Sequence, residues 1–265
     1  MLGFSVGYGN LWRFPYLLYR NGGGVFFIPF FISIVVIVYP MFYVEMAYGQ
    51  IYRPKLDEFY SNFHPKLLAL GFGMVLVNLY IILYFQSIVA WCFSFFLYSF
   101  QDPLPWAVKD NNFLDDTYFN EEFLQRSTGL IDINKYIPII VISTIIVTGL
   151  ILIIVRRGID SAKNYIYILI TLPYVLLTVL LIKGMTLPGF LVGWRYLFMP
   201  DWSKLWTSRI WIDAAAQAMF SIGIAQLSLI FISTNRSKSD PLFHSSLFIS
   251  SMNYFTSIFG AMTLF

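Results

Sequence analysis

Near the start of the chain, residue types that interrupt helices fall within a stretch that otherwise reads as a membrane helix. They are Gly3, Gly7, Gly9, Asn10, Arg13 and Pro15. Irregular backbone at membrane depth is tolerated only where it is buried in protein or lines an aqueous cavity, and the half-helix ends there present N–H and C=O groups to ions and carboxylates. The pattern predicts a broken helix at a binding site. A loosely packed helix with small-residue contacts is the alternative.

Two pairs of neutral polar residues stand four positions apart in apolar segments. Gln217 and Ser221 form the first pair, and Asn253 and Ser257 form the second. Residues four apart share one face of a helix. Neutral oxygen and amide groups suit a monovalent ion better than a zinc or calcium centre. Hydrogen bonds that merely join helices are the alternative.

Glu45 is the one charged residue in the apolar stretch 25–47. A charge at the centre of a bilayer costs about 2.5–3.5 kcal/mol on insertion scales, which predicts an internal position for Glu45, with protonation as one way to lower the cost. Snorkelling to the nearby membrane boundary is the alternative. The sequence contains no nucleophile–base arrangement, phosphate loop or metal-spaced cluster, so we expect no enzyme.

The elements that must position these residues are long apolar blocks. The chain is 58% hydrophobic, 20% aromatic and 12% charged, far from the roughly 25% charged residues of soluble domains. About 20 apolar residues cross a bilayer. The sequence therefore predicts an all-α polytopic membrane protein with seven spans, in a single transmembrane domain covering 1–265: 2–18, 25–47, 67–100, 136–155, 164–182, 212–233 and 242–265.

The connecting segments predict the orientation. The acidic segment 101–135 is expected to be an extracellular loop, and the tight connector 156–163 carries three cations, which favours a cytosolic location for that turn and for the amino end. Cys92 is the only cysteine and lies in an apolar span, so no intramolecular disulfide can form.

Four motifs resemble one family of transporters. The sequence reads GYGNLWRFPY from Gly7, NGGGVF from Asn21, PMFYVE from Pro40 and WIDAAAQ from Trp211. These motifs resemble those of the sodium- and chloride-dependent neurotransmitter and amino-acid symporters. The resemblance implies a LeuT-type fold of two inverted repeats. The first repeat covers about 1–183, and the beginning of the second covers about 208–265. By this correspondence the fold is truncated after about seven helices, and the first span is itself shortened.

The resemblance also implies two kinds of ion site. Sodium would be bound by six residues: Gly3, Ser5, Val6, Asn10, Ser221 and Asn253. Chloride would be bound by five: Tyr43, Gln217, Ser221, Asn253 and Ser257. Chloride-independent relatives keep a carboxylate near the anion site, and none of these five residues is acidic. We therefore expect Na⁺ and Cl⁻ as coupled ions.

Substrate contacts follow from the same correspondence. The implied substrate-binding residues are Gly7, Tyr8, Gly9, Phe85, Phe220 and Gly223, with Arg13 as the cationic half of an external gate. Monoamine carriers of the family have an aspartate where this chain has Gly7. The glycine therefore indicates an amino-acid-like substrate whose own carboxylate completes a sodium site.

Two functional hypotheses follow. The first is sodium- and chloride-coupled transport of an amino acid or amino-acid-like neurotransmitter by alternating access across the plasma membrane. The second is a non-transporting relative that binds a ligand or partner. It is suggested by Phe85, which replaces a tyrosine of the family, and by the unwound segment of the family's sixth helix, where Ala225-Gln226-Leu227 replaces glycine, phenylalanine and glycine. The expected partners are the substrate and the lipid bilayer but no nucleic acid, and the sequence leaves an oligomer or accessory subunit open.

Overall fold

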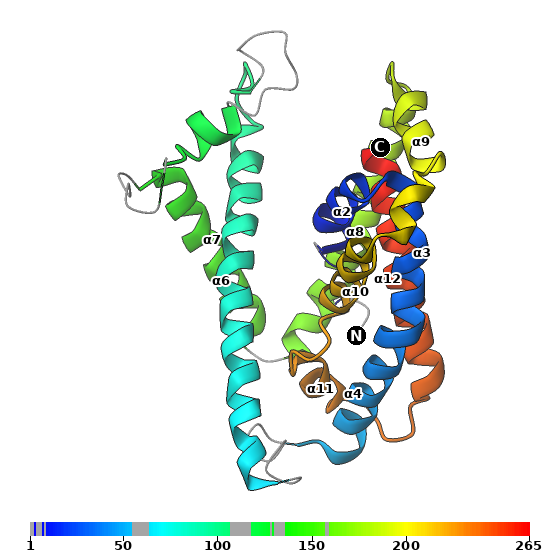
Figure 1. Ribbon diagram of the computed structural model, residues 1–265. Helices are drawn as coiled ribbons and strands as arrows, with labels where there is room; N and C mark the ends of the chain where they lie inside the picture. The colour runs from blue at the N-terminus through cyan, green and yellow to red at the C-terminus, as the bar shows by residue number, and fades with distance from the viewer. Residues whose placement is uncertain are drawn as a thin grey trace. The chain divides into compact units, whose positions relative to one another are not determined.

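The computed structural model describes residues 3, 7, 9–54, 64–106, 118–127, 129, 136–156 and 159–265 of the chain. These residues form two compact units: Met1–Val77 with Asn164–Phe265, and Asn78–Lys163. Figure 1 shows helices throughout the described part of the chain.

Five helical stretches are long and apolar enough to cross a membrane, and they match five predicted spans. They are Gly23–Tyr52, Leu68–Tyr98, Pro138–Val155, Tyr165–Met185 and Leu242–Leu264. The second, third and fifth are α6, α7 and α12, and the fourth lies within α8 (Ile159–Met185). Local composition was enough to find these helices.

The predicted span 212–233 is broken, in agreement with the unwound segment that the resemblance implied at 225–227. It consists of α10 (Ser208–Ile222) and α11 (Ser228–Ser233), separated by a non-helical segment. In the predicted span 2–18, the described part begins with a π-helical turn, η1 (Gly9–Arg13). It is followed by α2 (Phe14–Arg20). The other residues before Gly9, apart from Gly3 and Gly7, lie outside the described part of the chain.

The stretch Gly23–Tyr52 changes its helical type along its length. It runs through η2 (Gly23–Phe26), α3 (Phe27–Ser33), the π-helical η3 (Ile34–Val38) and α4 (Tyr39–Tyr52). Pro40 is the second residue of α4, just after η3, and has no N–H to donate, which accounts for a widened turn at this point. The helix ends at Arg53, whose φ of 47° is left-handed.

The core of the first unit begins with aromatic side chains from α2, η2 and α3. The ring of Phe14 lies 5.7 Å from that of Phe26 and 4.6 Å from that of Phe30, measured between centroids, and all three side chains are fully buried. Against this core, α10 packs on α3, and both α11 and α12 pack on α4 (Figure 1).

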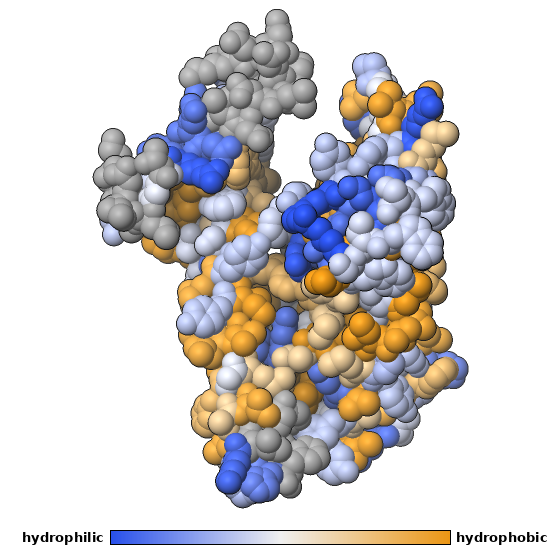
Figure 2. All heavy atoms as spheres, viewed as in Figure 1, coloured by the Kyte–Doolittle hydropathy of each residue, from blue (hydrophilic) through white to orange (hydrophobic). Residues whose placement is uncertain are grey.

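The outer side of α3 and η3 is apolar and exposed. Figure 2 shows hydrophobic residues gathered over this part of the first unit. The exposed side chains there are Ile28, Phe31, Ile32, Val35 and Val36. An exposed apolar helix face of this length is the expected surface toward lipid tails.

The glycine triplet that follows α2 allows a close contact with α9 (Phe190–Phe198). Gly22 and Gly23 have φ values of 88° and 74°. A Cβ on Gly24 would lie 2.1 Å from the carbonyl oxygen of Leu197 in α9. Only glycine fits at this approach, which explains why the turn reads Gly-Gly-Gly.

Candidate functional site: a buried polar cluster between broken helices

The break between α10 and α11 places unusual backbone at the centre of the first unit. α10 ends at Gly223, with φ of 72°, and Ala225 and Leu227 follow with φ of 61° and 59°. A left-handed conformation costs a non-glycine residue about 1–2 kcal/mol. The surrounding structure therefore holds this segment in a conformation that its own residues disfavour.

The turn η1 faces the same region from the start of the chain. Its first two residues, Gly9 and Asn10, are buried. A Cβ on Gly9 would lie 3.8 Å from the Cα of Ser221 in α10, and a Cβ on Gly260 in α12 would lie 3.3 Å from the carbonyl oxygen of Asn10. η1 thus lies directly against both helices.

Three side chains from η1, α10 and α12 meet in one hydrogen-bonded cluster. The Ser221 hydroxyl donates to Asn10 Oδ1 and lies 3.1 Å from Asn253 Oδ1. Asn253 Nδ2 donates to Ser221 Oγ at 2.8 Å, and Asn10 Nδ2 donates to the Asn253 carbonyl at 3.1 Å. All three side chains are buried. We call Asn10, Ser221 and Asn253 the triad.

The second member of each sequence pair adjoins the triad. Gln217 Nε2 donates to the carbonyl of Gly9 at 3.0 Å, and the Ser257 hydroxyl donates to the carbonyl of Asn253 at 3.0 Å. Both side chains are fully buried. Gln217 Oε1 is buried without a hydrogen-bond partner. A buried amide oxygen without a partner is costly and marks a place for a cation or another donor.

The cluster brings together neutral oxygen donors only. Asn10 Oδ1, Ser221 Oγ and Asn253 Oδ1 converge without a carboxylate, a thiolate or an imidazole among them. Divalent metals are held by charged or imidazole ligands, and the described residues contain no group of three His, Cys, Asp or Glu that could bind a metal. The donor set fits a hard, singly charged cation.

Comparison of the sequence with known proteins shows the family of this chain. The profile of the sodium:neurotransmitter symporter family matches residues 1–117 and 115–265. The chain belongs to this family. It is therefore an all-α polytopic membrane protein of the LeuT type, in a family of secondary transporters and not of enzymes.

Three relatives show the range of similarity within the family. The sodium-dependent neutral amino acid transporter B(0)AT1 of Mus musculus is 35% identical over 277 residues, covering 100% of this chain and 44% of the relative. The sodium-dependent serotonin transporter of Drosophila melanogaster is 31% identical, covering 100% and 46%. The inactive sodium-dependent neutral amino acid transporter B(0)AT3 of Homo sapiens is 36% identical, covering 99% and 44%. The chain thus spans about half the length of these symporters.

Glu45 contacts the break between α10 and α11, and the sequence did not predict this contact. Its Oε1 accepts a hydrogen bond from the backbone N–H of Ala225 at 2.8 Å, and its Oε2 is buried without a partner. The prediction of an internal position is confirmed, since the side chain is half-buried. A charge inside an apolar block was the available signal, but the partner lies 180 residues away.

Four predicted ion ligands remain, and the structure describes two of them, Tyr43 and Gly3. Tyr43 lies on α4 with 36% of its surface exposed, and no described hydrogen bond joins it to the four other predicted chloride ligands. Gly3 lies near α8, where a Cβ would come within 3.0 Å of both Ile166 and Ile170. Ser5 and Val6 lie outside the described residues.

The predicted substrate residues fall in three places. Gly9, Phe220 and Gly223 lie beside the triad, and the guanidinium of the predicted gate residue Arg13 stacks 4.7 Å above the Phe220 ring. Gly7 is exposed, and Tyr8 lies outside the described residues. Phe85 belongs to α6 within the second unit.

Proposed function

We propose that this protein takes part in sodium-coupled transport of an amino-acid-like substrate, with sodium carried as a co-substrate on the triad. The observation that supports this is the convergence of Asn10, Ser221 and Asn253 from three separate helical elements, one of which belongs to a broken helix. The ion would replace hydrogen bonds that now join these side chains to one another. Occupancy of the site would then depend on how η1 lies against α10 and α12.

The full ligand sets go beyond the triad. The Ser5 carbonyl and the substrate carboxylate would complete the first sodium site, and the Gly3 and Val6 carbonyls would contribute to a second. The amides of Tyr8 and Gly9 would bind the carboxylate, with Phe220 and Gly223 lining the pocket. Arg13, which stacks on Phe220, would close over the bound substrate from the extracellular side.

Gly7 supports the substrate class. A Cβ at this position would meet nothing within 4 Å, so there is room for a larger side chain, yet the residue carries no charge. An amine substrate would be left without a counter-ion, whereas an amino acid brings its own carboxylate. The proposed location is the plasma membrane with a cytosolic amino end, and an oligomer or accessory subunit is compatible with this role.

Chloride coupling is the finer part of the proposal. Gln217, Ser221, Asn253 and Ser257 are neutral, so an anion would balance the sodium charge. The Ser257 hydroxyl donates to the Asn253 carbonyl, so it would have to rotate to reach an anion. Tyr43 would have to turn inward from its exposed position.

A non-transporting role is the second candidate. It is supported by Phe85, which lacks a hydroxyl, and by Ala225 and Leu227, which hold left-handed backbone where glycine is free of strain. One relative, human B(0)AT3, is itself described as inactive. In this case the site would bind its ligand without a transport cycle.

Uptake of radiolabelled neutral amino acids by cells expressing the protein tests both candidates. Transport predicts uptake that falls to background when sodium is replaced by N-methylglucamine, and that falls when chloride is replaced by gluconate. Uptake indifferent to sodium refutes the proposal, and indifference to gluconate refutes only the chloride part. Absent uptake that Phe85→Tyr restores supports the second candidate, whereas robust uptake by the unmodified protein refutes it.

A further inference from the structure

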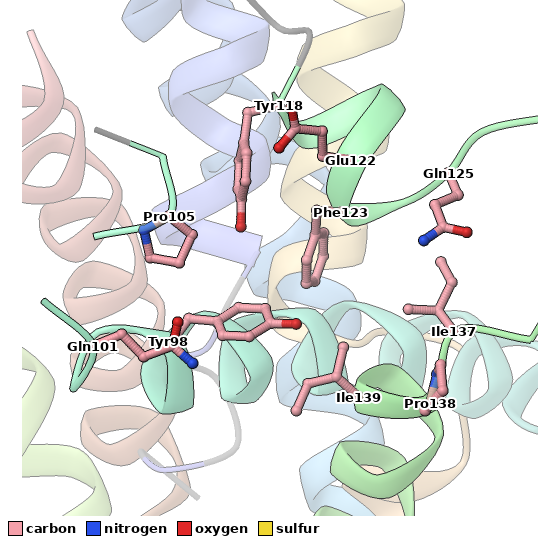
Figure 3. A pocket seen from close by; sticks show the side chains of 10 residues that line it. All are labelled: Tyr98, Gln101, Pro105, Tyr118, Glu122, Phe123, Gln125, Ile137, Pro138 and Ile139. Atoms are coloured by element: carbon pink, nitrogen blue, oxygen red, sulfur yellow. The ribbon is translucent and has the colours of Figure 1, made fainter. Parts of the chain in front are cut away.

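The second unit contains a cavity of about 520 Å³ where the end of α6, the π-helical turn η5 (Tyr118–Phe123) and the start of α7 come together. Its volume lies within the roughly 300–1,000 Å³ of small-molecule sites. Figure 3 shows the rings of Tyr98, Tyr118 and Phe123 around this space, with Glu122 next to Tyr118. They are Tyr98, Gln101, Pro105, Tyr118, Glu122, Phe123, Gln125, Ile137, Pro138 and Ile139.

Aromatic rings form one part of the lining. Phe123 is 3% exposed, and its ring centroid lies 4.5 Å from that of Phe95 on α6. Tyr98 meets the same Phe123 ring edge-to-face at 6.4 Å, and Tyr118 lies 6.4 Å from the ring of Trp106. These contacts hold the rings in place, so the aromatic surface is formed in advance. The faces of such rings carry negative charge density and attract cations.

The charge of the lining has the same sign. Glu122 is the one ionisable carboxylate among the ten lining residues, and none of the ten is Lys, Arg or His. Burial raises the pKa of Tyr118, and the nearby Tyr98 and Glu122 raise it further because their negative charges oppose a phenolate. The carboxylate of Glu122 is the one charged group among the lining residues, and a negative charge there favours a cation in the cavity.

We propose that this cavity binds a small organic ammonium ion, with its apolar body against Tyr98, Tyr118 and Phe123 and its charged head near Glu122. The cavity lies entirely within the second unit, whereas the triad lies entirely within the first. Its lining shares no residue with the proposed transport site, so the proposal stands whether or not the protein transports.

Choline and its neutral isostere 3,3-dimethylbutanol test the role of charge at constant shape. The chain is purified in lipid nanodiscs, and binding is followed by saturation-transfer NMR of each probe. The key variant is Glu122→Gln, with Glu121→Gln as the matched control. Glu121 is the preceding residue of η5, carries the same charge and does not line the cavity.

Choline is expected to bind more tightly than 3,3-dimethylbutanol, and Glu122→Gln is expected to weaken choline binding about three- to tenfold, the range for a partly exposed charged contact. Glu121→Gln is expected to leave choline affinity unchanged within about twofold. Equal affinity for the two probes overturns the proposal. Equal losses in the two variants also overturn it, because they indicate only a general attraction of cations to an acidic surface.

A second pair of variants tests the aromatic contribution. Tyr118→Phe keeps the ring and is expected to keep choline binding, whereas Tyr118→Leu removes the ring face and is expected to weaken binding about two- to tenfold. Equal binding by the Phe and Leu variants overturns the role assigned to the ring. Circular dichroism of each variant checks that the helices are retained, so that lost binding is not lost folding.

Discussion

The hydrogen bond between Glu45 and Ala225 allows a direct test of what holds the break between α10 and α11. Glu45 Oε1 accepts from the Ala225 N–H at 2.8 Å, and Ala225 is held at a φ of 61°. Two neutral replacements separate the acceptor from the charge. Glu45→Gln keeps a carbonyl oxygen at the same reach, whereas Glu45→Met has a similar shape and no comparable acceptor.

The expected size of the effect follows from the burial of this contact. A buried backbone N–H left without a partner costs about 1–3 kcal/mol, which is the upper range for this partly buried contact. For a domain of 150–250 residues each kcal/mol lowers the Tm by about 2–4 °C, so the Met variant should melt about 2–12 °C below the Gln variant. Neither replacement can ionise, so their difference reports mainly the presence of the acceptor.

Intrinsic tryptophan fluorescence during heating of the detergent-solubilised protein measures the two Tm values. Hydrogen exchange gives a local reading, and the segment containing Ala225 is expected to exchange about 5–150 times faster in Glu45→Met than in Glu45→Gln. If the two variants melt and exchange alike, the bond does not hold the break. If both fall equally below the unmodified protein, the negative charge and not the acceptor is what matters.

Three further results are expected. Gly49→Ala should destabilise the protein by about 1–3 kcal/mol in thermal melts, because the new Cβ would lie 2.2 Å from a carbonyl oxygen of α11. The control is Gly73→Ala, whose Cβ would meet nothing within 4 Å, and it should be neutral or slightly stabilising. Ser221→Ala should raise the sodium concentration for half-maximal uptake about 10- to 100-fold, and an unchanged value would remove this residue from the sodium site. Hydrogen bonds from the hydroxyl and amide of Ser203 lower the pKa of Asp201, so Ser203→Ala should raise that pKa toward its ordinary value in an NMR titration. Because the pKa of Asp201 is lowered in the folded state, the ionised carboxylate stabilises the folded protein. This stabilisation is present above the ordinary carboxyl pKa and is lost as the pH falls through the folded-state value.

The spans and the family motifs were open to prediction because they depend on local sequence. Insertion into lipid requires a continuous apolar run, and composition alone located five helices. The i,i+4 pairs were also informative, since Gln217 and Ser221 share one face of α10 and Asn253 and Ser257 share one face of α12. In the structure all four side chains are buried and hydrogen-bonded, and the ion site itself stays a prediction.

The partners of these residues were decided by the tertiary structure. Gln217 donates to the carbonyl of Gly9, 208 residues earlier, and Glu45 accepts from Ala225, 180 residues later. Such pairs depend on how distant helices pack, and no local pattern specifies that. The resemblance implied ligand sets but not the bonds that the ligands make with one another.

The break at 223–227 also separates what the sequence specifies from what helix packing specifies. By hydropathy 212–233 is one apolar block, and neither Ala225 nor Leu227 favours positive φ. Tertiary contacts impose that conformation, because Glu45 binds the Ala225 N–H and Leu227 is buried in a cluster that includes Tyr48 and Met74. The sequence alone determined that these segments are membrane helices bearing a polar face. The resemblance implied an unwound segment at 225–227, and the tertiary structure decided which contacts hold it open, since long-range contacts outweigh a local cost of about 1–2 kcal/mol per residue.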